Sequence, residues 1–247
     1  MLRAFLGALG FFSRIPVPHG EAHWQAFART PATFPLVGYL LGAIVALPLL
    51  APVPAPIGAV AFVAWLYLVT GITHLDGLAD LGDAVAVHGS TAERRAVMAD
   101  PTVGAGGVLA IGLVLLALVA GGLVLVTLPY RALAIVVTAE VGAKTGMAIV
   151  GCLGTASHEG LGSAITERAT PWSLPLVGLL AVPAALLTWP RPLPAVVALT
   201  VAVLAAPLVL VSSRRLFDGV SGDVLGATNE LARVAALNAG VIAWTLS

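Results

Sequence analysis

The sequence has 247 residues, of which 59% are hydrophobic and only 10% are charged, and its mean hydropathy is +1.02. A soluble domain carries about 25% charged residues, so this composition excludes an ordinary water-soluble protein. The net charge of zero argues against nucleic acid as a partner, and the single Cys152 excludes an internal disulfide.

The chain begins with an apolar segment that has the length of a signal-peptide core. It extends to Phe12 and carries one early arginine, Arg3. No small-residue cleavage pattern follows, because Ser13-Arg14-Ile15-Pro16 comes at once. We therefore predict a short interfacial or re-entrant helix at the N-terminus rather than a cleaved signal.

Long segments without Asp, Glu, Lys or Arg dominate the rest of the chain. They cover residues 30–75, 101–130, 169–190 and 192–213. A spanning helix needs about 20 mostly apolar residues, and a cluster of prolines between 48 and 56 divides the first segment into two. The sequence therefore predicts an all-α fold, a polytopic integral membrane helical bundle with about seven transmembrane helices. The predicted spans are 34–51, 56–73, 106–127, 131–150, 172–189, 194–212 and 230–246.

Basic residues are distributed unevenly between the two sides of this predicted bundle. With the N-terminus in the cytoplasm, only Arg131 and Arg191 lie outside, in very short turns. The arginines inside or at the inner boundary are then Arg3, Arg14, Arg29, Arg94, Arg95, Arg168, Arg214, Arg215 and Arg233. The acidic residues gather in the inner loops 74–105, 152–171 and 213–229 or at their edges. No repeat or appended soluble domain is visible, so we expect one membrane domain, 1–247, with its charged chemistry on the cytoplasmic face.

The strongest candidate for chemistry is the segment from His74 to Asp83. Asp76, Asp80 and Asp83 follow one another at i, i+4 and i+7, so on a helix they share one face. Leucines between them keep the setting apolar, and no Lys or Arg balances the charge. Carboxylates in such a row suit Mg²⁺, which uses a few carboxylates and leaves positions for substrate phosphates. The alternative is a solvated helix that begins just outside the membrane.

A second candidate segment follows, from Glu93 to Gly107. Arg94 and Arg95 are suited to binding phosphate oxygens, and Asp100 precedes a proline and a glycine-rich entry into the next span. Backbone N–H groups at such a helix start can meet an anion. Arginines that only set the topology, with a glycine-rich helix entry, explain the same pattern.

The third candidate segment extends from Asp218 to Glu230. Asp218 and Asp223 lie in a glycine-rich loop, and Asn229 with Glu230 stands at a predicted helix start. These oxygen ligands suit a hard cation or a hydroxyl group. A plain surface loop is the default alternative, but this loop lies on the same predicted membrane face as the first aspartate row.

One pair of ionisable residues lies inside a predicted span. Glu140 and Lys144 are separated by one helical turn, and charged groups within the membrane are candidates for function. The equally good alternative is that the two neutralise each other. Apart from His74 in the first motif, the histidines are scattered without ligand spacing, and we assign them no role.

These motifs, in this order, resemble the cobalamin synthase family, the adenosylcobinamide-GDP ribazoletransferases of the bacterial inner membrane. The resemblance covers nearly the whole chain. Its marks are Phe12-Ser13-Arg14-Ile15-Pro16, Phe34-Pro35-Leu36-Val37-Gly38, His74-Leu75-Asp76-Gly77-Leu78-Ala79-Asp80 with Asp83, Glu93-Arg94-Arg95 through Asp100 and Gly104, Gly160-Leu161-Gly162, and Gly222-Asp223-Val224-Leu225-Gly226-Ala227 with Asn229-Glu230.

The resemblance implies a magnesium-dependent transferase that joins adenosylcobinamide-GDP to alpha-ribazole or its 5′-phosphate and releases GMP. It implies Asp76, Asp80 and Asp83 on the metal, with Asp223 completing a second metal site or taking the proton of the nucleophile. Further binding contacts are expected from Arg94, Arg95 and Asp100, with Asp218, Asn229 and Glu230 as weaker candidates for the aspartate site. The expected partners are these two small molecules and membrane lipid, and a homo-oligomer is compatible with the sequence.

The sequence departs from the family pattern at three places. Ala84 follows Asp83 where glycine is usual, and Asp100-Pro101 replaces Asp-Ser. Thr155-Ala156-Ser157-His158-Glu159 lacks the usual Tyr-Ala-Arg, so an arginine contact to phosphate is not expected from this loop. Two other classes compete. A CDP-alcohol phosphotransferase needs Asp-x-x-Asp-Gly-x-x-Ala-Arg, which Ala84 breaks, and a secondary transporter would use Glu140 and Lys144 on an ion path.

Overall fold

The computed structural model describes residues 1–18 and 20–247, and in these residues the secondary structure is helical apart from one isolated bridge between Ala156 and Val220. The α-helices are α1 (Leu2–Phe12), α2 (Glu21–Ala28), α3 (Thr33–Val45), α4 (Ala55–Thr70), α5 (Thr73–Ala86), α6 (Thr91–Met98), α7 (Ala105–Leu125), α8 (Ala134–Leu153), α9 (Leu161–Thr166), α10 (Leu174–Ala181), α11 (Leu193–Phe217) and α12 (Gly222–Leu246). Short 3-10 helices η1 to η4 cover Leu47–Leu50, Tyr130–Leu133, Pro171–Ser173 and Val182–Leu186. The all-α prediction is confirmed.

The helices have the length and composition of a multi-pass membrane protein. Four segments are long and apolar enough to cross a membrane, namely Thr33–Leu50, Ala105–Leu125, Tyr130–Leu153 and Leu193–Phe217, and α4 with α5 forms a bent fifth candidate. The predicted span 172–189 is a shorter helix that continues into η4, and 230–246 is part of the largely buried α12. The predicted count of seven spans is therefore not confirmed.

Helix α8 forms the centre of the bundle, and small residues let its neighbours approach it closely. A Cβ on Gly38 of α3 would lie 2.7 Å from the Cα of Val141, and a Cβ on Gly142 would lie 2.5 Å from the Cβ of Ala202 on α11. Such close packing of small residues is how helices associate where lipid removes the hydrophobic driving force. The surfaces of α7 and α11 are instead covered by exposed leucines, among them Leu116 and Leu208, as expected for helices that face lipid.

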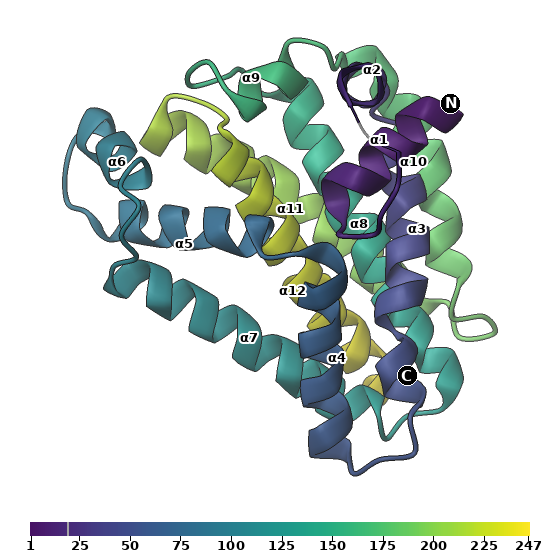
Figure 1. The fold of residues 1–247 in the computed structure, drawn as a ribbon. Coiled ribbons are helices and arrows are strands. Elements are labelled where there is room, and N and C mark those ends of the chain that lie inside the picture. The colour runs from purple at the N-terminus through teal and green to yellow at the C-terminus, as the bar shows by residue number, and fades with distance from the viewer. Residues whose placement is uncertain (19) are drawn as a thin grey trace.

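The chain bends by 100° between α4 and α5, and this bend places the first aspartate motif. Gly71 makes the bend with a φ of 75°, a conformation that favours glycine. Helix α5 therefore runs across the bundle instead of continuing α4 through it (Figure 1). We treat α5 as lying outside the membrane-spanning segments.

The N-terminal helix α1 has 11 residues, too few to span a bilayer. It packs against α2 and α3 through a cluster of aromatic rings formed by Phe11, Phe12, Trp24, Phe27 and Phe34. The predicted short helix is confirmed, and its place at a membrane surface stays a prediction.

The acidic segments collect at one end of the molecule. Helices α5, α6 and α9 and the junction between α11 and α12 gather at the upper left of Figure 1, whereas the C-terminus lies at the lower right. The three predicted inner loops thus share one end of the bundle.

Candidate active site

The two aspartate motifs meet where α5 crosses the start of α12. A Cβ on Gly77 would lie 2.7 Å from the Cα of Asp223, and a Cβ on Gly226 would lie 3.0 Å from the Cα of His74. Only glycine permits this approach, which explains why both motifs carry one. Residues almost 150 positions apart are thus brought into one site, as the sequence predicts for Asp80 and Asp223.

Asp80 lies at the centre of this carboxylate cluster. Partial burial and the negative charges of Asp223, Asp76 and Asp83 raise the pKa of Asp80 to about 6. Within the described part of the chain, no positively charged side chain forms an ion pair with Asp76, Asp80 or Asp223. The site therefore holds an excess of negative charge that a cation or a proton would relieve.

Asp83 has a different environment from the other two aspartates of α5. Its two carboxylate oxygens accept hydrogen bonds from the backbone N–H groups of Gly104, at 2.7 Å, and Gly107, at 2.9 Å. These N–H groups belong to the first turn of α7, so Asp83 caps that helix from a neighbouring element. Its predicted role as a metal ligand would have to share oxygens that already bind the backbone.

Of the two arginines predicted to bind phosphate, one is occupied by backbone contacts and the other is not. The guanidinium of Arg94 donates to the carbonyls of Ala84 and Val85 at 2.7 and 3.1 Å, so it caps the end of α5. Arg95 makes only a 4.0 Å ion pair with the exposed Asp218 and lines an open cavity. Arg95 is therefore the arginine that is free to meet a phosphate.

Asp100 forms a local turn. One of its oxygens accepts hydrogen bonds from the backbone N–H and the hydroxyl of Thr102, which lower the pKa of Asp100. It lines a small surface hollow with Asp83 and the Gly104–Gly106 turn. Its predicted contact with substrate stays a prediction, as does that of Asp218.

Two cavities open on either side of Asp223. The larger, of about 620 Å³, is walled by α6 and includes Arg95, Ala96 and Ser157. The smaller, of about 230 Å³, is lined by Phe11, His74, Asp76, Met147 and Leu161 among others. Asp223 and His158 line both cavities, so a group bound in one can reach a group bound in the other beside these two side chains.

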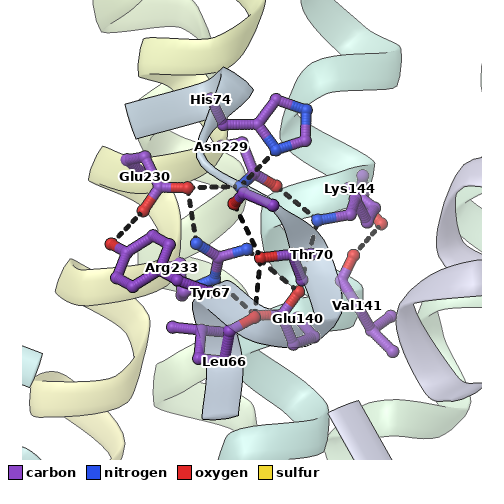
Figure 2. Close-up of polar contacts among 12 residues, drawn as sticks. Leu66, Tyr67, Thr70, His74, Glu140, Val141, Lys144, Asn229, Glu230 and Arg233 are labelled. Atoms are coloured by element: carbon purple, nitrogen blue, oxygen red, sulfur yellow. Dashed lines mark hydrogen bonds and ion pairs between the residues drawn. The ribbon is translucent and has the colours of Figure 1, made fainter. Parts of the chain in front are cut away.

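Beneath the smaller cavity lies a buried network of charged residues (Figure 2). Glu140 forms ion pairs with Lys144 at 3.2 Å and with Arg233, and Arg233 also pairs with Glu230 at 2.5 Å. All four are at most 2% exposed. Two negative and two positive charges therefore neutralise each other within the bundle.

Neutral polar groups complete this network. Tyr67 donates its hydroxyl to Glu230 at 2.9 Å, and Lys144 donates to Asn229 Oδ1 at 2.6 Å. No buried side-chain N or O atom among the described residues lacks a hydrogen-bond partner. The pairing of Glu140 with Lys144 is thus part of a closed structural cluster, which favours the structural alternative for this pair.

For three members of this cluster, the position differs from the one predicted from the sequence. Arg233 was expected at the inner boundary of the membrane, but it is buried beside Glu140 because α12 begins at Gly222 and carries Arg233 three turns into the bundle. Asn229 and Glu230 were the weaker candidates for the aspartate site, yet both are buried in the network and neither lines the two cavities.

Two histidines that line the cavities had no assigned role. His158 lies in the loop tied to the start of α12 by hydrogen bonds between Thr155 and Val220 and between Ser157 and Val220. His74 opens the first aspartate motif and faces the smaller cavity. The glycines near His74 and His158 indicate that another backbone segment packs closely there. The sequence spacing does not show which distant segment it is.

The carboxylates fit a magnesium ion only together with a substrate. Among the described residues, no group of three or more His, Cys, Asp or Glu side chains is arranged to hold an ion. Mg²⁺ commonly binds one or two carboxylates and completes its coordination with water and substrate phosphates. Asp80 and Asp223 repel each other and have no ion pair among the described residues, so they provide that partial ligand set, and the metal stays a prediction.

Comparison with known proteins identifies the family. The family model described as cobalamin-5-phosphate synthase matches residues 4–241. The chain belongs to this family. It is 57% identical to an adenosylcobinamide-GDP ribazoletransferase of Halorubrum lacusprofundi over 99% of both chains, and 44% identical to one of Haloquadratum walsbyi over the full length of both. A relative of the same name from Deinococcus radiodurans is 38% identical over 89% of this chain and 78% of its own. No solved structure matches.

Membership of the cobalamin-5-phosphate synthase family decides between the classes that the sequence left open. It confirms the resemblance and supports neither the CDP-alcohol phosphotransferase nor the transporter. The neutralised Glu140–Lys144 pair agrees, because a closed cluster offers no free coupling group for an ion.

Proposed function

We propose that this protein transfers the adenosylcobinamide phosphoryl group of adenosylcobinamide-GDP to a hydroxyl of alpha-ribazole or its 5′-phosphate, and that GMP leaves. The relatives named adenosylcobinamide-GDP ribazoletransferase support this activity. The single structural observation that carries it is that Asp223 lines both cavities. A condensation needs two substrates bound so that their reacting atoms are in contact.

In the proposed reaction the ribose hydroxyl oxygen attacks the phosphorus nearer the cobinamide. A new P–O bond forms, the bond from that phosphorus to the bridging oxygen breaks, and its electron pair leaves with GMP. The hydroxyl proton passes to a carboxylate, and Asp223 is the best placed because it lines both cavities. Arg95, on the wall of the larger cavity, binds the diphosphate oxygens.

Asp80 and Asp223 would hold Mg²⁺, with Asp76 next to them on the smaller cavity. When bound, the ion supplies positive charge to the diphosphate and stabilises the leaving group. The excess negative charge that raises the pKa of Asp80 supports a cation here. Asp223, which lines both cavities, also holds the hydroxyl in line for attack, since positioning supplies much of the rate in phosphoryl transfer.

We place the site on the cytoplasmic side of the cytoplasmic membrane. Helix α6, which carries Arg94 and Arg95, and the end of α11, which carries Arg214 and Arg215, lie at the same end of the bundle as α5 and the start of α12 (Figure 1). An excess of basic residues marks the inner side of membrane proteins. Modification of Ser90→Cys by an impermeant reagent should require opened cells. Modification in intact cells would reverse this orientation.

The activity is tested with the purified protein, adenosylcobinamide-GDP and alpha-ribazole, with and without Mg²⁺, by the release of GMP and the appearance of the joined product. We expect both products in equal amounts and only with the metal present. GMP release without the joined product would indicate hydrolysis, and turnover unaffected by a chelator would exclude the metal.

A further inference from the structure

His74 is a buried side chain that contacts the charge network through its ring nitrogen Nδ1 and also lines the smaller cavity. It is 6% exposed and stands at the first turn of α5, against the rings of Phe11 and Phe12. Its Nδ1 lies 3.4 Å from Nδ2 of Asn229, a long hydrogen-bond contact. What His74 offers to a ligand depends on which nitrogen carries the proton.

The buried charge network fixes the orientation of the Asn229 amide. Lys144 can only donate, so its 2.6 Å contact identifies the amide oxygen of Asn229. The amide nitrogen is then left with two N–H groups. It donates one to Glu230 Oε1, at 3.0 Å, and the other points to His74 Nδ1.

A ring nitrogen that accepts a hydrogen bond carries no proton. His74 Nδ1 is therefore the acceptor, and the proton of the neutral ring is on Nε2. Figure 2 shows Nδ1 facing Asn229 and the other edge of the ring turned away from the network. His74 lines the smaller cavity, and Nε2 has no hydrogen-bond partner among the described residues, so Nε2 is the ring nitrogen available to a ligand there.

The two cavities differ in charge. Of the residues that the structure describes, Asp76 and Asp223 line the smaller cavity but no Lys or Arg does, whereas Arg95 lines the larger one. The diphosphate therefore has a fixed cationic partner in Arg95 of the larger cavity, whereas a cation at the smaller cavity would be the metal that Asp80 and Asp223 hold. A neutral group with hydroxyl donors suits the smaller cavity, because its hydroxyls can donate to the carboxylates.

The walls of the smaller cavity also favour a flat, partly apolar ligand. Phe11, Met147 and Leu161 provide apolar and aromatic surface in the same cavity as His74 and the carboxylates of Asp76 and Asp223. A nucleoside has both parts, a planar heterocycle with acceptor atoms and a ribose with hydroxyls.

We propose that the smaller cavity is the binding site of the acceptor nucleoside, and that the Nε2–H of His74 donates a hydrogen bond to an acceptor atom of that nucleoside. This rests on the proposed function, since it assigns one of its two substrates to a cavity. The charge network then has a second role beyond stability, because Lys144, Asn229 and Glu230 together keep His74 in the donating form. The heterocycle lies between Phe11 and Met147 with its ribose hydroxyl directed to Asp223.

Two matched variants test the cavity assignment without touching the network. Leu161→Trp fills the mouth of the smaller cavity from the half-exposed helix α9, and Ala96→Trp fills the larger cavity from the exposed face of α6. Equilibrium binding of alpha-ribazole and of adenosylcobinamide-GDP is measured separately for each by calorimetry. We expect Leu161→Trp to weaken alpha-ribazole binding at least tenfold and leave adenosylcobinamide-GDP within threefold, and Ala96→Trp to do the reverse.

A second pair of variants tests the donor. His74→Phe keeps a ring but removes the N–H, and His74→Gln can place an amide N–H near the position of Nε2. We expect His74→Phe to weaken alpha-ribazole binding by about tenfold, as for one lost hydrogen bond to a buried group, and His74→Gln to restore most of it. A merely structural role of His74 would instead weaken both ligands together or lower the thermal stability of both variants.

The outcomes separate this inference from the proposed function. Wild-type protein that binds both molecules but releases no GMP would overturn the function and leave the cavity assignment to be decided by the binding data. Leu161→Trp that binds alpha-ribazole normally, or that loses adenosylcobinamide-GDP instead, would overturn the assignment whatever the activity.

Discussion

The protein contains two groups of charged side chains that differ in how their charge is balanced. In the bundle centre, Glu140 and Glu230 face Lys144 and Arg233, and all four are buried. At the bundle end, no basic side chain of the described residues forms an ion pair with Asp76, Asp80 or Asp223, and Asp76 is exposed. The comparison suggests that a balanced set holds helices together, whereas an unbalanced set is completed by a ligand.

The largest effect is expected from breaking the balanced set. Arg233→Met leaves Glu140 and Glu230 buried with one cation fewer, and removing one partner of a buried ion pair costs about 3–5 kcal/mol. We expect strong destabilisation in thermal unfolding of the detergent-solubilised protein. The matched control is Arg215→Met, an exposed arginine, which should unfold like wild type. Equal stability of the two variants would mean that the network contributes little.

The unbalanced set should behave in the opposite way, with loss of activity and not of stability. Asp223→Asn removes a carboxylate from the junction of both cavities, and loss of one group that stabilises the transition state costs about 3–4 kcal/mol, roughly a hundred- to thousand-fold in rate. The thermal transition should stay at or above that of wild type. Near-normal turnover in a folded variant would remove Asp223 from the reaction.

A smaller effect is expected at the larger cavity. Arg95→Ala removes the free guanidinium and should raise KM for adenosylcobinamide-GDP about tenfold, equivalent to about 1.4 kcal/mol, with KM for alpha-ribazole unchanged. Asp218→Asn breaks only the exposed 4.0 Å ion pair of Arg95 and should leave both values near wild type. Equal changes in both KM values after Arg95→Ala would place Arg95 outside substrate binding.

The smallest effect is a gain in stability at the acidic site. The folded protein raises the pKa of Asp80 to about 6 from an ordinary 3.8, so the folded state binds this proton more tightly than the unfolded state. Ionised Asp80 therefore destabilises the metal-free fold above pH 6, and this penalty disappears as the pH falls to 3.8. Because Asp80 is partly exposed, screening reduces the penalty to about 1 kcal/mol.

Asp80→Asn should accordingly raise the melting temperature at neutral pH by about 2–4 °C without Mg²⁺, and by nothing near pH 4. Glu167→Gln changes an exposed carboxylate directly after α9; it is the control and should show no change. Added Mg²⁺ should stabilise wild type and not Asp80→Asn. A variant that is less stable than wild type at neutral pH would contradict the repulsion described here.

The sequence predicts the fold class from local patterns, because charge-free segments indicate helices in lipid. It predicts that the two aspartate motifs meet because both are acidic, glycine-flanked segments on the same predicted membrane face, and the close approaches at Gly77 and Gly226 bring them together. Asp83 and Arg94 could not be assigned in this way. Each of them caps a helix terminus that comes near it only when the chain folds. Asp83 accepts from Gly104 at the start of α7, and Arg94 donates to Ala84 near the end of α5.

Only part of the buried charge network could be predicted from the sequence, for a related reason. Glu140 and Lys144 lie one turn apart, so their pairing can be read from spacing, but Arg233 reaches Glu140 from a helix 93 residues further on. Arg233 was assigned to the membrane boundary because basic residues near a predicted inner loop usually lie there. The start of α12 at Gly222, earlier than the predicted span at 230, moves Arg233 into the bundle.

The central claim is that the aspartates of α5 and α12 act as one unit. It is tested most directly by a double-mutant cycle of Asp80→Asn and Asp223→Asn, with turnover of adenosylcobinamide-GDP and alpha-ribazole as the measurement. Residues that act on one transition state are strongly non-additive. We predict that the double variant is within about tenfold of the poorer single variant. A multiplicative loss, about 10⁴- to 10⁶-fold if each single change costs a hundred- to thousand-fold, would show that the two aspartates act independently.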